Sequence, residues 1–127
     1  MKGIKARLVP AITLLPLTIL LSAESLLAET LKTQHFNVTI TRNCREGNVT
    51  CSDVTYVGRE LTTGNSIRLK GKTMQQMCAD RVTPCRFIGY EFRNRNYRYV
   101  VTANGTLQVY RDAKLLLSEE GTWDEEK

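Results

Sequence analysis

Arginine and aromatic side chains are interleaved within residues 86–98, and this stretch is the part of the sequence best suited to recognising a partner. Arginine matches the planar, bidentate geometry of carboxylate and phosphate groups, and arginine and tyrosine are frequent anchors of protein interfaces. We expect a partner-binding site around a turn at 93–96, made by Arg93, Arg95, Tyr97 and Arg98. An acidic protein surface, an acidic envelope glycan or a lipid head group would supply the opposite charge. The alternative is that the aromatic residues form the core and the arginines are solvated turn residues.

Cysteines carry the second chemical signal, and the four of them are Cys44, Cys51, Cys78 and Cys85. An even number in a short exported chain is typical of disulfide bonds. We expect the first two and the last two to pair. A turn at Gly47-Asn48 would place the first pair face to face across a hairpin. The second pairing follows from the equal spacing and from Pro84, which favours an irregular loop. The spacing is wider than that of a zinc ribbon, so we expect no metal.

Few residues are placed for catalysis. Bridged cysteines leave no thiol nucleophile, and the single histidine, His35, lies near the expected mature N-terminus, where chains fray. The carboxylates within the body of the chain are scattered, and no phosphate loop, dinucleotide fingerprint or calcium loop is present. We therefore expect neither an enzyme nor a cofactor. Arginine beside tyrosine can stack nucleic acid bases, but an exported protein rarely meets nucleic acid, so we expect no such partner.

The composition is that of one small globular domain with an uneven charge distribution. The chain is 42% hydrophobic and 24% charged, and this composition excludes a disordered chain. Its length of 127 residues is too short for two ordinary domains. Residues 32–118 hold 14 basic and six acidic side chains, whereas residues 119–127 hold five carboxylates and one lysine. We expect a basic body followed by an acidic C-terminal tail at 119–127.

The N-terminal segment has the pattern of an export signal. Three basic residues precede 16 residues without charge, at 8–23. That run is shorter than the roughly 20 residues that span a membrane, so an uncleaved anchor is the weaker alternative. We expect a signal peptide at 1–28, with cleavage after Ala28 and with Ala23 and Ser25 as open alternatives. The mature chain would then be periplasmic or secreted, with no transmembrane span.

Alternation of apolar and polar residues predicts strands throughout the mature chain. It runs through 36–41, 54–56 and 67–70, with turn signals such as Gly64-Asn65 between strands. We expect one all-β domain at 29–118, folded as a small antiparallel barrel or sandwich of six to seven strands with two local disulfides. Residues 73–80 are the one candidate for a short helix.

Two turns predict the pairing of the last strands. A two-residue turn at Asn104-Gly105 would place Tyr99 opposite Tyr110. A four-residue turn at 93–96 would place Tyr90 opposite Tyr99. One face would then collect Ile88, Tyr90, Phe92, Tyr97, Tyr99, Val101 and Tyr110, and the other Phe87, Glu91, Arg98, Val100, Leu107, Val109 and Arg111. A slip of one residue would exchange the faces of a strand.

Two features of the chain leave alternatives open. Trp123, the only tryptophan, either plugs the end of the barrel or lies on a loose segment, and the acidic tail is a candidate to fold over the basic body. Asn37, Asn48 and Asn104 each begin a glycosylation triplet. Those triplets would carry sugars only in a eukaryotic secretory pathway.

A set of spaced residues adds a resemblance, and it comprises Cys51, Thr63-Gly64, Gly71, Cys78, Pro84-Cys85, Gly89-Tyr90, Gly105, Leu107 and Val109. The pattern resembles small uncharacterised periplasmic proteins of Gram-negative bacteria. The design, a short exported β domain with local disulfides, is also similar to that of periplasmic lysozyme inhibitors. The resemblance implies a periplasmic compartment.

Together these patterns predict a binding or inhibitor module that engages an anionic or protein partner through the arginine–aromatic hairpin. The alternative is a structural or envelope-associated protein without a discrete ligand site.

Overall fold

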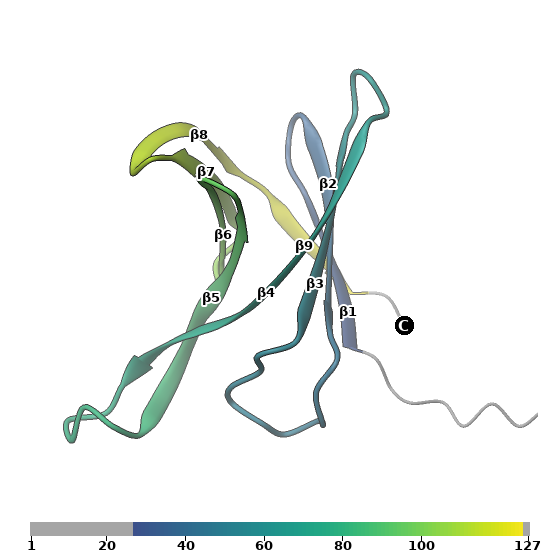
Figure 1. The fold of residues 1–127 in the computed structure, drawn as a ribbon. Coiled ribbons are helices and arrows are strands. Elements are labelled where there is room, and N and C mark those ends of the chain that lie inside the picture. Colours follow the sequence, from purple (N-terminus) through teal and green to yellow (C-terminus); the bar gives the residue numbers. More distant parts are fainter. Residues whose placement is uncertain (1–26, 126–127) are drawn as a thin grey trace, which may run out of the picture.

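The computed structural model describes residues 27–125, which form one antiparallel sheet that curls until it is nearly closed, like a barrel (Figure 1). The strands are β1 (Leu27–Lys32), β2 (Phe36–Arg42), β3 (Val54–Glu60), β4 (Ser66–Met77), β5 (Pro84–Asn94), β6 (Tyr97–Thr102), β7 (Thr106–Arg111), β8 (Lys114–Glu120) and β9 (Thr122–Glu125). Their order in the sheet is β8-β7-β6-β5-β4-β3-β2-β1-β9. The expected signal peptide, residues 1–28, lies outside the described residues except for its last two positions.

The all-β, antiparallel, barrel-like fold is confirmed, but the count of six to seven strands is wrong, because the described residues form nine. The short helix expected at 73–80 is also wrong. Strand β4 continues to Met77 and pairs with β5, and Thr73 is a buried residue of β4 that pairs with Tyr90. Pairing with a long neighbouring strand outweighs the weak local preference for a helix.

The sheet closes through a sharp change of neighbour at Gly121. Strand β8 pairs with β7 at one edge of the sheet. Strand β9 begins one residue later, after Gly121, and pairs with β1 at the other edge. The backbone N–H of Gly121 donates to the carbonyl of Gly105 at 2.8 Å. A Cβ atom at Gly121 would lie 2.5 Å from the carbonyl oxygen of Lys32, so only glycine lets the two ends of the sheet approach.

The acidic C-terminal segment takes part in this closure. Residues 119 and 120 belong to β8 and residues 122–125 form β9, so the sheet extends beyond residue 118. Trp123 packs against the core, and its indole N–H donates to the carbonyl of Ala103 at 3.1 Å. Glu119 accepts hydrogen bonds from the Thr33 hydroxyl at 2.8 Å and from the His35 backbone at 3.2 Å. The end of the chain therefore ties β1, β2 and the β6–β7 loop together.

The core lies on the concave face of the sheet. Its largest fully buried side chains are Tyr56, Phe92, Leu31, Ile40, Leu107, Val38, Val54 and Val101. The ring of Tyr56 contacts those of Phe92 and Tyr99, with centroids 5.1 and 5.5 Å apart. Burying an aromatic or large aliphatic side chain stabilises the fold by about 1.5–3 kcal/mol. The expected inward placement of Tyr90, Phe92 and Val101 is confirmed.

The β5–β6 hairpin has a tighter turn than the four residues expected. Only Arg95 and Asn96 lie between the strands, and Arg95 adopts a left-handed φ of 60°. Tyr99 therefore pairs with Phe92 instead of Tyr90. The predicted register of β6 against β5 is therefore wrong by two residues. A shift of two does not change which face of the sheet the side chains of β6 occupy, because faces repeat with a period of two.

The β6–β7 pairing differs from the prediction by one residue, and that exchanges the faces of β7. The loop has three residues, 103–105, and Gly105 has a φ of +95°. The Thr102 hydroxyl accepts the backbone N–H of Thr106 at 2.9 Å and so supports the longer loop. Tyr99 pairs with Val109. Tyr110 consequently lies on the convex face, and Val109 packs on the core with Leu107.

A bulge in β5 exchanges two further residues. The pairing with β4 shifts between Met74 and Gln75, which leaves Ile88 as the extra residue. Ile88 is 40% exposed, although it was expected on the aromatic face. Phe87 instead packs on Tyr90, with ring centroids 5.0 Å apart. An extra residue in one strand reverses the alternation of that strand from the bulge onward.

Candidate functional site

Both predicted disulfides are present. Cys44 bonds to Cys51 and Cys78 to Cys85, with Cα separations of 5.8 and 5.1 Å. The first bridge closes the β2–β3 loop, but the expected hairpin ladder is absent, because β2 ends at Arg42 and β3 begins at Val54. The turn spans residues 45–48 and is one residue earlier than predicted. Disulfides of this kind are typical of proteins that fold in an oxidising compartment.

The four residues predicted for partner binding lie on two faces of the sheet. Arg93 and Arg98 pair across β5 and β6, and their side chains lie on the convex, outer face. Arg95 is exposed in the turn between the two strands, and Tyr97 is half-buried at the start of β6. The hairpin therefore brings Arg93 and Arg98 together and leaves Arg95 at its tip.

Glu91 neutralises part of the hairpin's charge. Arg98 donates from Nε to Glu91 Oε2, and Arg93 Nη2 lies 3.6 Å from the same oxygen. The hydrogen bond from Arg98 is the main reason that the pKa of Glu91 lies below its ordinary value, with burial opposing it and the charges of Arg98, Arg93 and Lys72 adding to it. The guanidinium of Arg98 also lies 5.5 Å from the ring centre of Tyr110. Arg98 is thus held on both sides by its own sheet.

Strand β4 adds three cations that the sequence prediction did not assign to a site. Arg68, Lys70 and Lys72 occupy alternate positions, opposite in direction to the buried Leu69 and Thr73. Outward positions on one strand are about 7 Å apart. The signal was present in the sequence as an alternation of basic and apolar residues, but nothing local linked that strand to the hairpin.

The pairing of β4 with β5 makes one continuous surface of these residues. Lys72 pairs with Glu91, which in turn contacts the two hairpin arginines. We call this surface the basic face, and it consists of Arg68, Lys70, Lys72, Arg93 and Arg98. Its two carboxylates are Glu91 and Asp53, which lies 3.1 Å from Lys70 Nζ.

The ion pairs on the basic face leave some of its charge available. Both partners of the Lys70–Asp53 pair are more than half exposed, and exposed pairs of this kind contribute little to stability. Arg68 makes no ion pair within the described part of the chain. A surface with five cations and two carboxylates attracts anions and repels cationic partners.

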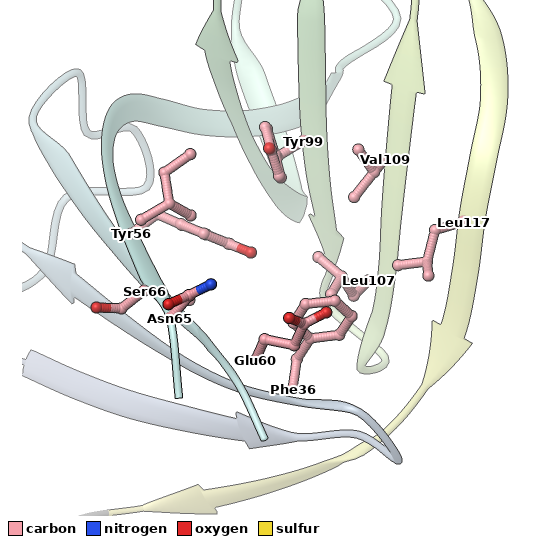
Figure 2. Close-up of a pocket in the computed structure, with 11 residues that line it drawn as sticks. Phe36, Tyr56, Glu60, Asn65, Ser66, Tyr99, Leu107, Val109 and Leu117 are labelled. Atoms are coloured by element: carbon pink, nitrogen blue, oxygen red, sulfur yellow. The ribbon is translucent and has the colours of Figure 1, made fainter. Parts of the chain in front are cut away.

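A second feature lies on the opposite, concave side of the sheet. It is a half-open pocket between the two halves of the curled sheet (Figure 2), and its volume is about 330 Å³. Strands β2, β3 and β4 form one wall, and β6, β7 and β8 form the other. The residues that line it are Phe36, Tyr56, Gly58, Glu60, Asn65, Ser66, Ile67, Tyr99, Leu107, Val109 and Leu117.

No known protein family, no curated protein and no solved structure matches this chain. Within residues 27–125 no helix is long and apolar enough to cross a membrane. The basic face and the apolar pocket are therefore the two candidate sites of the molecule.

Proposed function

We propose that this chain is an exported binding protein, in the periplasm or outside the cell, whose basic face captures an anionic partner. The observation that carries the proposal is the row formed by Arg68, Lys70 and Lys72 on β4, next to Arg93 and Arg98 on the neighbouring hairpin. These five cations face two carboxylates. A rigid sheet that holds several cations in fixed positions favours a partner with several anionic groups.

The partner should present carboxylate or phosphate groups, because both are recognised by arginine in a bidentate manner. Arg68 and the exposed Arg95 make no ion pair within the described residues, so their guanidinium groups are available to a partner. Arg98 has a different role, since Glu91 and Tyr110 already hold it. An acidic protein surface, as an inhibitor would meet on its target, has this chemistry, and so does an acidic envelope glycan.

Export is supported by the two disulfides and by the basic, apolar start of the sequence. The periplasm is the compartment that the resemblance to small periplasmic proteins implies. In that setting the protein would meet anionic envelope components and other exported proteins, and both supply the charge that the basic face requires.

Crosslinking in the native envelope tests the proposal at the level of single lysines. A carbodiimide joins lysine amines directly to carboxylates of a bound partner, and mass spectrometry then identifies the lysine and the partner. We expect crosslinks at Lys70 and Lys72, with few at Lys32 and Lys114, which lie outside the basic face. Crosslinks spread evenly over the four lysines would contradict the proposal. The mass of the attached fragment distinguishes a protein from a glycan.

A further inference from the structure

The pocket on the concave face has the size and lining of a site for a small molecule. Its volume of about 330 Å³ falls at the lower end of the range of roughly 300–1,000 Å³ that is common for ligand pockets. Leu107, Val109 and Leu117 form one wall, and Tyr56 lies across the space from them (Figure 2). Phe36 and Ile67 add to the apolar lining. These walls suit a flat apolar body.

Tyr56 places a buried hydroxyl in this pocket without a protein partner. The residue is 2% exposed, and its hydroxyl points into the space that the pocket encloses (Figure 2). It makes no hydrogen bond with any group in the described part of the chain. Burial raises the pKa of Tyr56, so the hydroxyl stays protonated and able to donate. Buried polar groups usually have a partner, and here the free space is the place for one.

Gly58 is the reason that the ring of Tyr56 can take this position. Both residues are on β3, two positions apart and on the same face. A Cβ atom at Gly58 would lie 2.6 Å from the Tyr56 hydroxyl oxygen and 2.7 Å from the ring. The missing side chain therefore lets the phenol lie along the strand and reach the pocket.

The polar side of the pocket selects the charge of the ligand. Glu60, Asn65 and Ser66 lie at the end of β3 and the start of β4. Glu60 accepts a hydrogen bond from the Thr63 hydroxyl at 2.7 Å, which fixes its carboxylate there. Among the lining residues, all in the described part of the chain, Glu60 is the only one that is charged at neutral pH. A carboxylate head group would be repelled there, whereas an amine would be attracted.

We propose that this pocket binds a small molecule with an aromatic body and a neutral or cationic head, which hydrogen-bonds to Tyr56 or Glu60. The aromatic body packs between the rings of Tyr56 and Phe36 and the aliphatic wall on β7 and β8. This site is independent of the basic face, which lies on the opposite side of the sheet and attracts the opposite charge.

Three indoles that differ only in their heads test the proposal: tryptamine, tryptophol and indole-3-acetate. We would titrate each into the full, oxidised, isotope-labelled chain and follow the backbone amide signals by NMR. We expect tryptamine and tryptophol to shift signals around the pocket, and tryptamine to bind about tenfold more tightly than indole-3-acetate, because one charge is attracted by Glu60 and the other repelled. Equal affinities, or shifts confined to the basic face, would overturn the proposal.

Conservative variants separate the contributions. Tyr56→Phe removes only the hydroxyl and should lower the affinity for tryptophol by about three- to tenfold, which corresponds to the loss of one hydrogen bond. Glu60→Gln should abolish the preference for the amine. Val109→Phe should fill the pocket and block all three indoles. The charge reversal Arg68→Glu with Lys72→Glu should leave the indoles unaffected. If Tyr56→Phe and Glu60→Gln fold as the wild type does and bind all three probes unchanged, the pocket is not the site.

Discussion

Arg98 on β6 donates a hydrogen bond from Nε to the carboxylate of Glu91 on β5, so the arginine at the centre of the predicted hairpin site is already engaged within the sheet. Only 36% of the Arg98 side chain and 13% of the Glu91 side chain are exposed. The pair ties the two strands of the β5–β6 hairpin to each other. If the basic face binds an anionic partner as proposed, we expect binding to depend more on Arg68 and Lys72, which are exposed on the same surface.

Neutralising Glu91 should strengthen the basic face. Glu91→Gln removes the one carboxylate that contacts both Arg93 and Arg98, and should tighten binding to immobilised polyglutamate by about two- to fivefold at low salt. Retention on a polyglutamate column over a salt gradient measures the effect. Glu120→Gln makes an equal charge change at the other end of the sheet and is the control. The same gain in retention for both variants would show that net charge alone determines binding to the column.

Asp80 should titrate with an unusually low pKa. Its carboxylate accepts from the Thr83 hydroxyl at 2.6 Å and from the backbone N–H groups of Thr83 and Val82, both at 2.9 Å. These hydrogen bonds lower the pKa of Asp80 to about 2, and the bond from the Thr83 hydroxyl has the largest effect. The support that Asp80 gives to the β4–β5 loop is therefore complete above the ordinary carboxyl pKa of 3.8 and is lost as the pH falls through 2.

An NMR titration of the Asp80 carboxyl carbon measures this value directly. Thr83→Val removes the shortest of the hydrogen bonds and should raise the pKa of Asp80 toward 3.8, while the disulfide that closes the loop stays intact. A pKa that is already ordinary in the wild type would show that the loop does not hold the carboxylate as described.

Removing the charge of Glu119 should loosen the closure of the sheet. Its Oε2 lies 2.6 Å from His35 Nδ1, and its Oε1 accepts from Thr33 at 2.8 Å. Glu119→Gln should lower the free energy of unfolding by about 1–3 kcal/mol, since one strong hydrogen bond is lost and a half-buried group is left less well paired. Urea unfolding followed by tryptophan fluorescence measures this, because Trp123 lies on the adjoining strand.

The pH dependence of that effect has a definite sign. Burial opposes ionisation of Glu119, but the hydrogen bonds from His35 and Thr33 outweigh it and hold the pKa of Glu119 below its ordinary 4.5. The stabilisation is therefore present above pH 4.5 and declines as the pH falls through the lowered pKa. The difference between wild type and Glu119→Gln should shrink on acidification, and a difference that grows instead would contradict this interpretation.

Removing the Cys44–Cys51 bridge should cost roughly 2.5 kcal/mol, the chain entropy of a loop of about eight residues. We expect Cys44→Ser with Cys51→Ser to unfold at a lower urea concentration than the wild type, with the other disulfide retained. Cys51 is 3% exposed and packs on the core, so Cys51→Ala with Cys44→Ala separates the loss of the bridge from the burial of a hydroxyl. An unchanged midpoint in both variants would show that the bridge does not support the fold.

Local sequence patterns predict the strands and disulfides of this protein better than the partners of each strand. Tyr90, Phe92 and Val101 face the core as expected, because alternation decides the face of a strand. The turn between β6 and β7 has one residue more than the asparagine–glycine signal predicts, and that single residue moves Tyr110 to the outer face. Turn length therefore limits what alternation can establish.

The candidate sites depend on neighbours that lie far apart in the chain. Lys72 and Glu91 are paired across β4 and β5, and no local pattern indicates that pairing, since the intervening loop holds a disulfide and a bulge adjoins it. The hydroxyl of Tyr56 reaches the pocket because Gly58 lacks a side chain and because β7 and β8 curl back opposite β3. Both relationships come from the curvature of the whole sheet.

Matched charge reversals measure the role of the basic face most directly. The affinity of the full, oxidised chain for polyglutamate, for an acidic glycan and for phosphatidylglycerol vesicles would be compared in two variants with the same change in net charge. Arg68→Glu with Lys72→Glu should abolish binding to each probe that the wild-type protein binds. Arg45→Glu with Arg81→Glu, which alters exposed residues in the two disulfide loops, should leave most of it. Equal losses in the two variants would contradict a localised site, and so would wild-type protein that binds none of the three probes.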